Sequence, residues 1–337
     1  MDKKSIRQLS AKLFNNQGFS IFIILFVAAL LFVPRFGNSL NLMNVMRQGA
    51  LIFCFSIGMT MVMILGGLDL SIGAVAALSS VLAATFIKNN QIVLGVLIGL
   101  GTGLAIGVIS GTVIARFKLP HFIMTYGMMQ IANGLTLNYT KGESIYGLPD
   151  SFRFLGIGFL GAIPVPVICG IALLIIFAFA MNRTILGRSI YAVGDSQTAA
   201  AFSAISVKQT IIATYALSGL LSSITGIIYT ARLGSAEGVM GQDWAMQAIA
   251  AAVLGGTSFA GGEGSVSGTA FGAIAVAILY NILNLVGFSP SWQKFAIGFV
   301  IVMTVTCNYL QKGLAARRLK ITGRAGKEVE KECAAEQ

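Results

Sequence analysis

Charged side chains are scarce in this sequence. Asp, Glu, Lys and Arg make up 10% of its 337 residues, whereas an ordinary soluble domain carries about 25%. Hydrophobic residues account for 56% of the chain, and glycine fills 40 further positions, so few polar side chains remain to cover a globule in water. The composition excludes an ordinary soluble protein and predicts one that lies in a lipid bilayer.

Groups that could catalyse a reaction or bind a nucleotide are also missing. No serine, histidine and acid fall together as a nucleophilic triad, no ligand cluster indicates a metal site, and the cysteines are scattered without a C-x-x-C pair. The glycine-rich run 261–269 lacks the Gly-Lys-Ser/Thr that cradles phosphates. We therefore expect no enzymatic activity, no metal and no cofactor in this chain.

Long apolar segments recur along the whole sequence. A helix needs about 20 apolar residues to cross some 30 Å of hydrocarbon, and ten segments approach that length. The eighth is the weakest, because it has only fifteen residues and contains Gln247; it is either a tilted or a broken helix. The ten segments are 19–34, 50–66, 70–87, 92–115, 120–139, 163–181, 210–231, 244–258, 265–286 and 294–310.

The basic residues give the orientation of this predicted all-α, polytopic membrane helix bundle. With ten spans and a cytoplasmic N-terminus, sixteen Lys and Arg lie inside and seven outside, as the positive-inside rule requires. Both termini are then cytoplasmic, and the net charge of +11 indicates contact with membrane lipid, not nucleic acid. We expect an N-terminal tail at 1–18, a transmembrane domain at 19–310 and a basic tail at 311–337.

Glycines mark close helix packing and two breaks. Gly95, Gly99, Gly103, Gly107 and Gly111 share one face of the fourth segment, which favours packing against a neighbouring helix over a pore lining. The sequence Ile-Leu-Gly-Gly at 64–67 is echoed by Val-Leu-Gly-Gly at 253–256. Transporter halves often share such breaks, although four residues can also match by chance.

Two titratable residues sit beside predicted spans. Asp69 follows Gly66 and Gly67 and precedes a new helix, so it is either a helix N-cap or a residue that gates or binds substrate. His121 follows Pro120, a residue favoured in the first helical turn, and we expect it to be solvated at the membrane interface. With so few charges inside the membrane, the chain has no relay that could drive transport by itself.

The longest inner connector, from Arg183 to Lys208, carries its own helical pattern. Asp195 or Ser196 can cap a short helix, and such a helix is marginal alone in water. It therefore rests either on the membrane surface or in a groove of another protein. The residues of interest are Gly194, Asp195, Ala199, Ala200, Ala201, Ser203 and Ile205.

Three blocks of sequence resemble the permease subunits of bacterial ATP-binding-cassette importers for monosaccharides. They are Gly-Gly-Leu-Asp-Leu-Ser-Ile-Gly-Ala at 66–74, the connector just described, and the stretch from Ala231 to Thr269. With 283–287, the resemblance covers nearly the whole chain. The sequence departs from the family pattern where Asp195 replaces Asn, Gln197 and Thr198 replace acids, Ala204 replaces Gly, and Gln247 replaces an acid.

The resemblance implies a particular set of partners in the bacterial inner membrane. These are a second permease subunit, identical or a sister, a cytoplasmic ATP-binding subunit that would dock on the connector, and an extracytoplasmic solute-binding protein. ATP would bind to the partner and not to this chain. Outer segments 35–49, 140–162 and 232–243 would meet the binding protein.

Candidates for the solute pathway are polar and aromatic side chains inside spans, because sugar hydroxyls need hydrogen-bond partners and an aromatic face. Such amides often tie helices together instead. A gradient-driven secondary transporter or facilitator, or a scaffold subunit without a pathway, remains the alternative. The pathway candidates are Thr125, Tyr126, Gln130, Asn133, Tyr280, Asn281 and Asn284.

Overall fold

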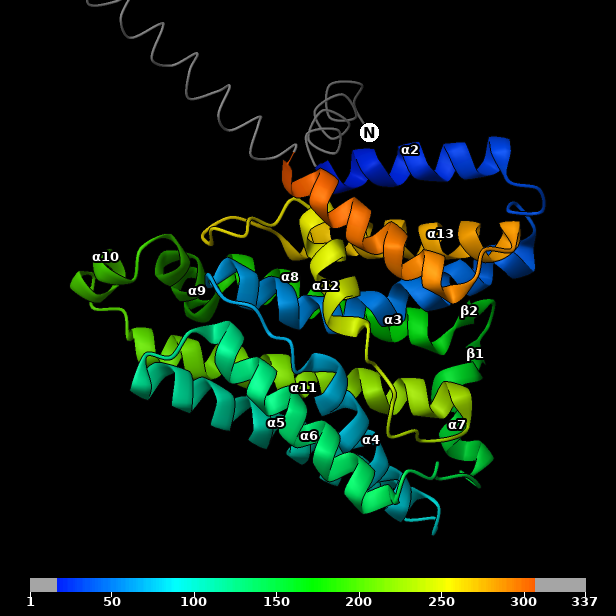
Figure 1. The fold of residues 1–337 in the computed structure, drawn as a ribbon, viewed down its shortest axis with the longest axis horizontal. Helices are drawn as coiled ribbons and strands as arrows, with labels where there is room; N and C mark the ends of the chain where they lie inside the picture. Colours follow the sequence, from blue (N-terminus) through cyan, green and yellow to red (C-terminus); the bar gives the residue numbers. More distant parts are fainter. Residues whose placement is uncertain (1–16, 307–337) are drawn as a thin grey trace, which may run out of the picture.

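The structure is a computed structural model that describes residues 17–306, and this part of the chain is a bundle of helices (Figure 1). The predicted tails, 1–18 and 311–337, lie outside the described residues except for 17 and 18, as do 307–310. The helices are α2 Gln17–Phe32, α3 Ser39–Ile64, α4 Ile72–Ile87, α5 Ile92–Phe117, α6 His121–Thr140, α7 Asp150–Ile157, α8 Val165–Arg183, α9 Ile185–Asp195, α10 Gln197–Phe202, α11 Val207–Leu233, α12 Trp244–Leu254 and α13 Val266–Val286, followed by a helix at 290–306.

Each of the ten predicted segments overlaps one helix, so the prediction of a helix bundle is confirmed. In the part of the chain that the structure describes, five helices, α3, α5, α8, α11 and α13, are long and apolar enough to cross a membrane. Within the described residues β structure is limited to one isolated bridge between Ile145 and Ala236 and a short hairpin, in which β1 Phe159–Leu160 pairs antiparallel with β2 Ile163–Pro164. Gly161 at φ +64° allows the tight turn between these two short strands.

The eighth predicted segment is a broken helix. Its helical part, α12, has eleven residues, about 16 Å of rise, which is roughly half of the 30 Å hydrocarbon core. Residues 235–243 lead into α12 from the end of α11, and a loop follows Leu254. The segment 244–258 therefore does not cross the membrane as one helix.

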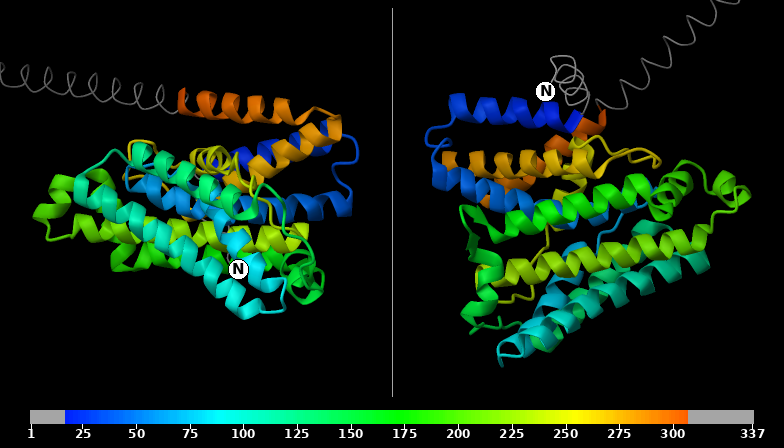
Figure 2. Two further views of the ribbon diagram at one scale, coloured as in Figure 1. Left: turned by 60° about the horizontal axis from the view of Figure 1, so that its bottom comes forward. Right: turned by 180° about the vertical axis from the view of Figure 1, so that it is seen from behind.

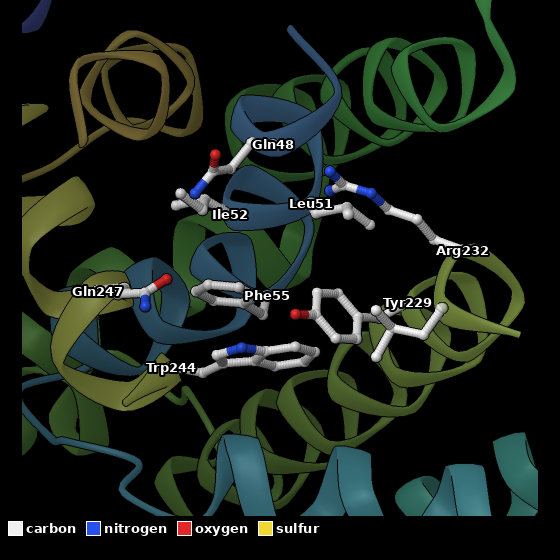
Figure 3. A pocket seen from close by; sticks show the side chains of 9 residues that line it. Gln48, Leu51, Ile52, Phe55, Tyr229, Arg232, Trp244 and Gln247 are labelled. Carbon is white, nitrogen blue, oxygen red and sulfur yellow. The ribbon is translucent and has the colours of Figure 1, made fainter. Parts of the chain in front are cut away.

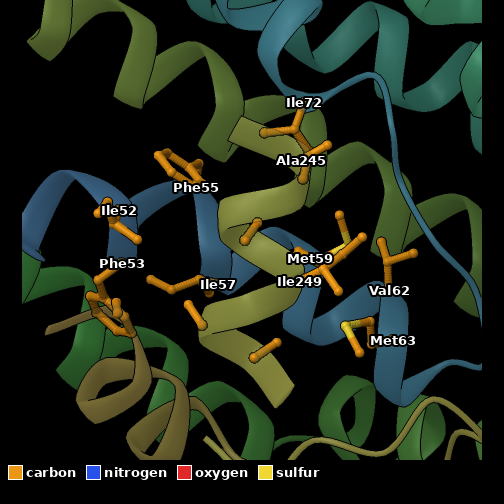
Figure 4. Packing of buried hydrophobic residues seen from close by; sticks show 14 of the residues in the cluster. Ile52, Phe53, Phe55, Ile57, Met59, Val62, Met63, Ile72, Ala245 and Ile249 are labelled. Atoms are coloured by element: carbon orange, nitrogen blue, oxygen red, sulfur yellow. The ribbon is translucent and has the colours of Figure 1, made fainter. Parts of the chain in front are cut away.

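Helix α3 forms the centre of the bundle. Its C-terminal half, from Leu51 to Ile64, is buried against α13, α11 and α12. Figure 4 shows α12 threaded along this core, with Phe55 and Ile57 of α3 on one side of it. In the two views of Figure 2 the long helices run roughly alongside one another, as expected for spans of one bilayer.

Close backbone contact explains the glycine stripe of α5. A Cβ atom at Gly103 would collide with the carbonyl of Gly219 on α11, and one at Gly107 would collide with the carbonyl of Tyr215. Gly95 and Gly99 lie against α4 instead. The stripe therefore packs α5 onto α11 and α4, as the sequence favours, because only a missing side chain lets the backbones approach so closely.

Two short helices begin inside the bundle, and their N-termini meet. The non-helical residues 65–71 lead from the end of α3 to α4, and 235–243 lead from the opposite end of the bundle to α12. A Cβ at Gly73 would overlap the carbonyl of Gly241, and Figure 4 shows Ile72 beside Ala245. An acid lies near each of these N-termini, Asp69 and Asp243, where the helix dipole favours negative charge.

Candidate functional site

A polar cavity opens between α3, α11 and α12, at the end of the bundle opposite the connector (Figure 3). We call it the outer cavity, because the predicted orientation puts this end outside. Its volume is about 240 Å³. The polar groups on its wall are Gln48, Arg232 and Gln247, and Figure 3 shows them around the aromatic side chains. Amide and guanidinium groups together can donate to and accept from a solute that carries hydroxyl groups.

Aromatic rings form the other part of the wall. Phe55 stacks on Trp244 with the ring centroids 4.9 Å apart and the planes 12° apart. Tyr229 meets the edge of the same indole at 5.2 Å and 76°. Trp244 is 7% exposed, so the stack joins the cavity to the packed core. Apolar ring faces beside a few directional polar groups are typical of sites for small polar molecules.

Asp69 both organises its own turn and ties two helices together. Its Oδ1 accepts hydrogen bonds from the backbone N–H of Ser71 at 2.9 Å and from the Ser71 hydroxyl at 2.6 Å. Its Oδ2 accepts from the Ser218 hydroxyl of α11 at 2.7 Å. At 3% exposure the carboxyl group depends on these donors. The N-cap of α4 is Ser71 and not Asp69, so Asp69 orders the turn before the helix and contacts α11 instead of capping α4 itself.

A second set of hydrogen bonds, which includes His121, holds the segment 65–71. The ring Nδ1 of His121 lies 2.8 Å from the Tyr215 hydroxyl, which donates to the carbonyl of Leu68 at 3.3 Å. Thr125 also reaches that carbonyl, at 3.2 Å. His121 is half-buried and hydrogen-bonded, so the prediction of a merely solvated interfacial histidine is wrong. Its partner Tyr215 comes from a helix far along the chain, which local sequence cannot reveal.

The connector between α8 and α11 forms α9 and α10 and packs on the end of α3. A Cβ atom at Gly194 would overlap the carbonyl of Ile64, and that carbonyl accepts from the N–H of Gly262 at 2.8 Å. The Tyr191 hydroxyl donates to the carbonyl of Gly264 at 2.7 Å, and burial raises the pKa of this phenol. One junction therefore joins α9, the end of α3 and the loop 255–264.

Helix α10 projects from the bundle (Figure 1). The Ser196 hydroxyl accepts from the N–H of Ala199 at 3.2 Å and caps the helix. Ala199 and Ala201 are exposed, whereas Ala200 is 3% exposed and packs into the core. Phe202 is 90% exposed, a large apolar side chain at the tip that the sequence analysis did not single out.

Comparison with known proteins shows the family of this chain. Residues 41–305 match the family described as "Branched-chain amino acid transport system / permease component". The chain belongs to this permease family. As a permease it is a multi-pass protein of the inner membrane and a transport protein, not an enzyme, which confirms the predicted class and location.

Several relatives resemble the permease over most of its length. The ribose import permease protein of Bacillus subtilis (strain 168) is 40% identical over 85% of this chain and 89% of its own length. The ribose import permease protein of Escherichia coli (strain K12) is 39% identical over 81% and 86%. The fructose import permease protein of Rhizobium meliloti is 34% identical over 84% and 81%. No solved structure matches the permease.

None of the seven predicted pathway residues lines the outer cavity. Asn281 exchanges two hydrogen bonds with Asn41 of α3, at 2.9 and 2.7 Å, and Asn284 accepts from Gln293 at 2.7 Å. These amides tie helices together, which is the alternative that the sequence left open. Thr125 fastens the segment at Leu68, as described above.

The other four predicted pathway residues lie on α6 and α13. Tyr126 is 47% exposed and stacks on Phe122 at 6.2 Å, Gln130 is exposed and Asn133 half-buried. Tyr280 lines a smaller cavity of about 110 Å³, beside the ion pair of Lys294 and Asp243 at 3.1 Å.

The sequence analysis missed the residues that line the outer cavity of the permease. Gln48, Phe55, Tyr229, Arg232 and Trp244 come from three helices that meet only in the fold. Arg232 and Gln247 do fall in the stretch that carries the family resemblance, and that was the available signal.

Proposed function

We propose that the permease is the membrane subunit of an ATP-binding-cassette importer and moves a monosaccharide-type solute that an extracytoplasmic binding protein delivers. The observation that supports this most directly is the outer cavity, where Gln48, Arg232 and Gln247 surround stacked aromatic rings. Its volume of about 240 Å³ suits one small polyol. The names of the ribose and fructose permeases agree with this solute class.

The partners follow from the same assignment. A cytoplasmic ATP-binding subunit docks on α10 through Ala199, Ala201 and Phe202, which are exposed there, while Gly194, Asp195, Ala200, Ser203 and Ile205 shape the connector. A second permease subunit, identical or a sister, completes the membrane part. The permease domain spans 19–310, with cytoplasmic tails at 1–18 and 311–337.

The junction of α9, the end of α3 and the loop 255–264 gives a route by which a movement of α10 reaches the outer cavity. Force on α10 reaches α9 and, through the backbone contact at Gly194, the end of α3 and the loop at Gly262. That loop continues directly from α12, whose first residue, Trp244, forms the wall of the outer cavity. ATP binding to the partner would thus shift a two-state equilibrium between an outward-open and an inward-open cavity.

Asp69 would hold the segment 65–71 during this change, with Gly66 and Gly67 as the hinge. Its hydrogen bond to Ser218 joins the break to α11, and Gly66 has φ +90°, a conformation that glycine adopts without strain. We therefore assign Asp69 as a structural pivot between α4 and α11 and not as a group that binds the solute.

A panel of labelled monosaccharides tests the solute class. The full transporter is reconstituted in proteoliposomes with its binding protein and ATP, and uptake of pentoses and hexoses is compared with uptake of branched-chain amino acids. Saturable uptake of one monosaccharide supports the proposal. Uptake of an amino acid alone, or of a sugar without ATP, would contradict it, and the second result would favour a gradient-driven carrier.

A further inference from the structure

A second and larger cavity lies at the connector end of the bundle. Its volume is about 670 Å³. Its walls come from the turn between α5 and α6, the start of α11, and α10. It therefore lies between the proposed docking helix and the bundle. Ala201 and Phe202 of the docking surface form one of its walls, whereas the walls from α5, α6 and α11 have no role in the transport proposal.

The charged groups on the cavity wall are all cationic. Lys118 and Lys208 line it, and no carboxylate does. The two ion pairs found among the described residues, Arg153 with Asp150 and Lys294 with Asp243, lie elsewhere. Lys118 stands at the end of α5 with φ +52°, an uncommon conformation for a residue with a side chain. Within the described chain, both lysines thus face the cavity without an anionic partner.

The cavity lies at the depth of the lipid headgroups. Helix α5 has 26 residues, about 39 Å of rise, so its end passes beyond some 30 Å of hydrocarbon. Phe117 and Phe122, next to the lining residues Lys118 and His121, are 65% and 55% exposed. Exposed phenylalanine rings beside cationic groups favour a surface in contact with lipid over one in water. The cavity therefore opens toward the bilayer.

Its apolar walls complete the fit to a lipid. Ile114, Leu119, Val207 and Ile211 line it together with the lysines. A free phosphate would leave these side chains in water, whereas a phospholipid would place its glycerol and upper acyl chains against them. Basic pockets between helices on the cytoplasmic side are known to hold anionic headgroups.

We propose that this cavity binds the phosphate headgroup of an anionic phospholipid from the cytoplasmic leaflet, held by Lys118 and Lys208. The bound lipid touches α10 through Thr198 and Phe202 on one side and His121 on the other. His121 in turn holds Tyr215 and the segment at Leu68. The bound lipid therefore connects α10 with the segment 65–71 before α4 and supports the position of α10, which we call its bracing role. This bracing role rests on the proposed function, whereas the binding site does not.

Native mass spectrometry of the full transporter, taken from nanodiscs of phosphatidylcholine with a minor fraction of phosphatidylglycerol, tests the site. The double variant Lys118→Gln/Lys208→Gln should lower the affinity for phosphatidylglycerol roughly thirtyfold, since each lysine near the membrane surface raises the affinity for anionic lipid about fivefold. The matched control is Lys88→Gln/Lys141→Gln, two exposed lysines that also follow helix ends, Lys141 with φ +54°, and it should retain the lipid.

Equal lipid retention in the two double variants would overturn the site. So would displacement of the lipid by inorganic phosphate, or its absence whenever the ATP-binding subunit is attached, which would give the cavity to that protein. Because these readouts need no transport, they stand even if the proposed function fails.

Solute-stimulated ATP hydrolysis tests the bracing role separately. Stimulation should rise with the phosphatidylglycerol fraction in the parent protein and in the control, and stay flat in the Lys118→Gln/Lys208→Gln variant. If that variant loses the bound lipid but keeps the same stimulation, the bracing role is wrong.

Discussion

Arg232 is the cationic group of the outer cavity, and its guanidinium offers several hydrogen-bond donors to a solute. We expect Arg232→Gln to raise the KM for uptake about tenfold, because a hydrogen bond from a charged group contributes about 1.5 kcal/mol. Uptake kinetics in proteoliposomes measure this. Arg116→Gln, at the opposite end of the bundle, is the control, and an unchanged KM in Arg232→Gln would remove Arg232 from the pathway.

Asp69 allows a test that separates structure from charge. Asp69→Asn keeps an oxygen for Ser71 and can still pair with the Ser218 hydroxyl, so it should insert and transport nearly as well as the parent. Asp69→Ala leaves buried donors unpaired and should lower the free energy of unfolding by about 1–3 kcal/mol. Thermal melting in detergent compares the two variants. A stable but inactive Asp69→Asn would show that the carboxylate charge itself takes part in transport.

The turn chemistry around Asp69 could be predicted from the sequence, but its partner could not. An acid after two glycines and just before a helix indicates a side chain that bonds to the backbone of the turn. The hydrogen bond from Ser71 N–H is of this kind, although the N-cap itself is Ser71. The tie to Ser218 links residues 149 positions apart, and no local pattern encodes such a contact. The same reason explains why in-span polar residues were assigned to the pathway when several of them join helices.

At the scale of elements, the backbone contact between α9 and α3 at Gly194 is the closest one along the proposed route from α10 to the outer cavity. Gly194→Ala must push the two backbones apart, at a cost of about 1–3 kcal/mol, and we expect it to uncouple ATP hydrolysis from solute binding. Gly101→Ala is the matched control, because a Cβ there meets nothing within 4 Å. Stimulated ATPase activity distinguishes them, and normal stimulation in Gly194→Ala would break the proposed route.

The exposed side of α10 makes a second prediction for the same element. Ala201→Arg points into the proposed interface and should abolish stimulation while leaving membrane insertion unchanged. Ala200 is 3% exposed, so Ala200→Arg buries a charge and should lower the yield of folded protein. Insertion assays and ATPase measurements separate these effects. Full stimulation in Ala201→Arg would place the ATP-binding subunit elsewhere.

Spans were predicted well because ten long apolar runs leave little choice of secondary structure. The break at α12 was only one of two alternatives, since fifteen apolar residues around Gln247 fit a tilted helix as well as a half-helix. The choice between them depends on the contact between Gly73 and Gly241, where the chain before α12 meets the start of α4. Helix ends that meet inside a bundle are a property of the fold and not of either segment.

For the whole molecule, the outer cavity and the connector lie at opposite ends of the bundle, joined by α3 and α12 (Figure 1). Among the described residues, the buried carboxyl group of Asp69 is bonded to serines and not to a basic group. In the proposed mechanism the outer cavity belongs to the solute pathway, and the connector with α10 is the place where the energy of ATP has to enter.

Solute accumulation in sealed proteoliposomes tests that claim most directly. With binding protein outside and ATP on the side of the ATP-binding subunit, the full transporter should raise the internal concentration of the solute above the external one. Vesicles that contain the permease without the ATP-binding subunit should not exceed equilibration under any imposed ion gradient. Uphill accumulation by the permease alone would contradict the account.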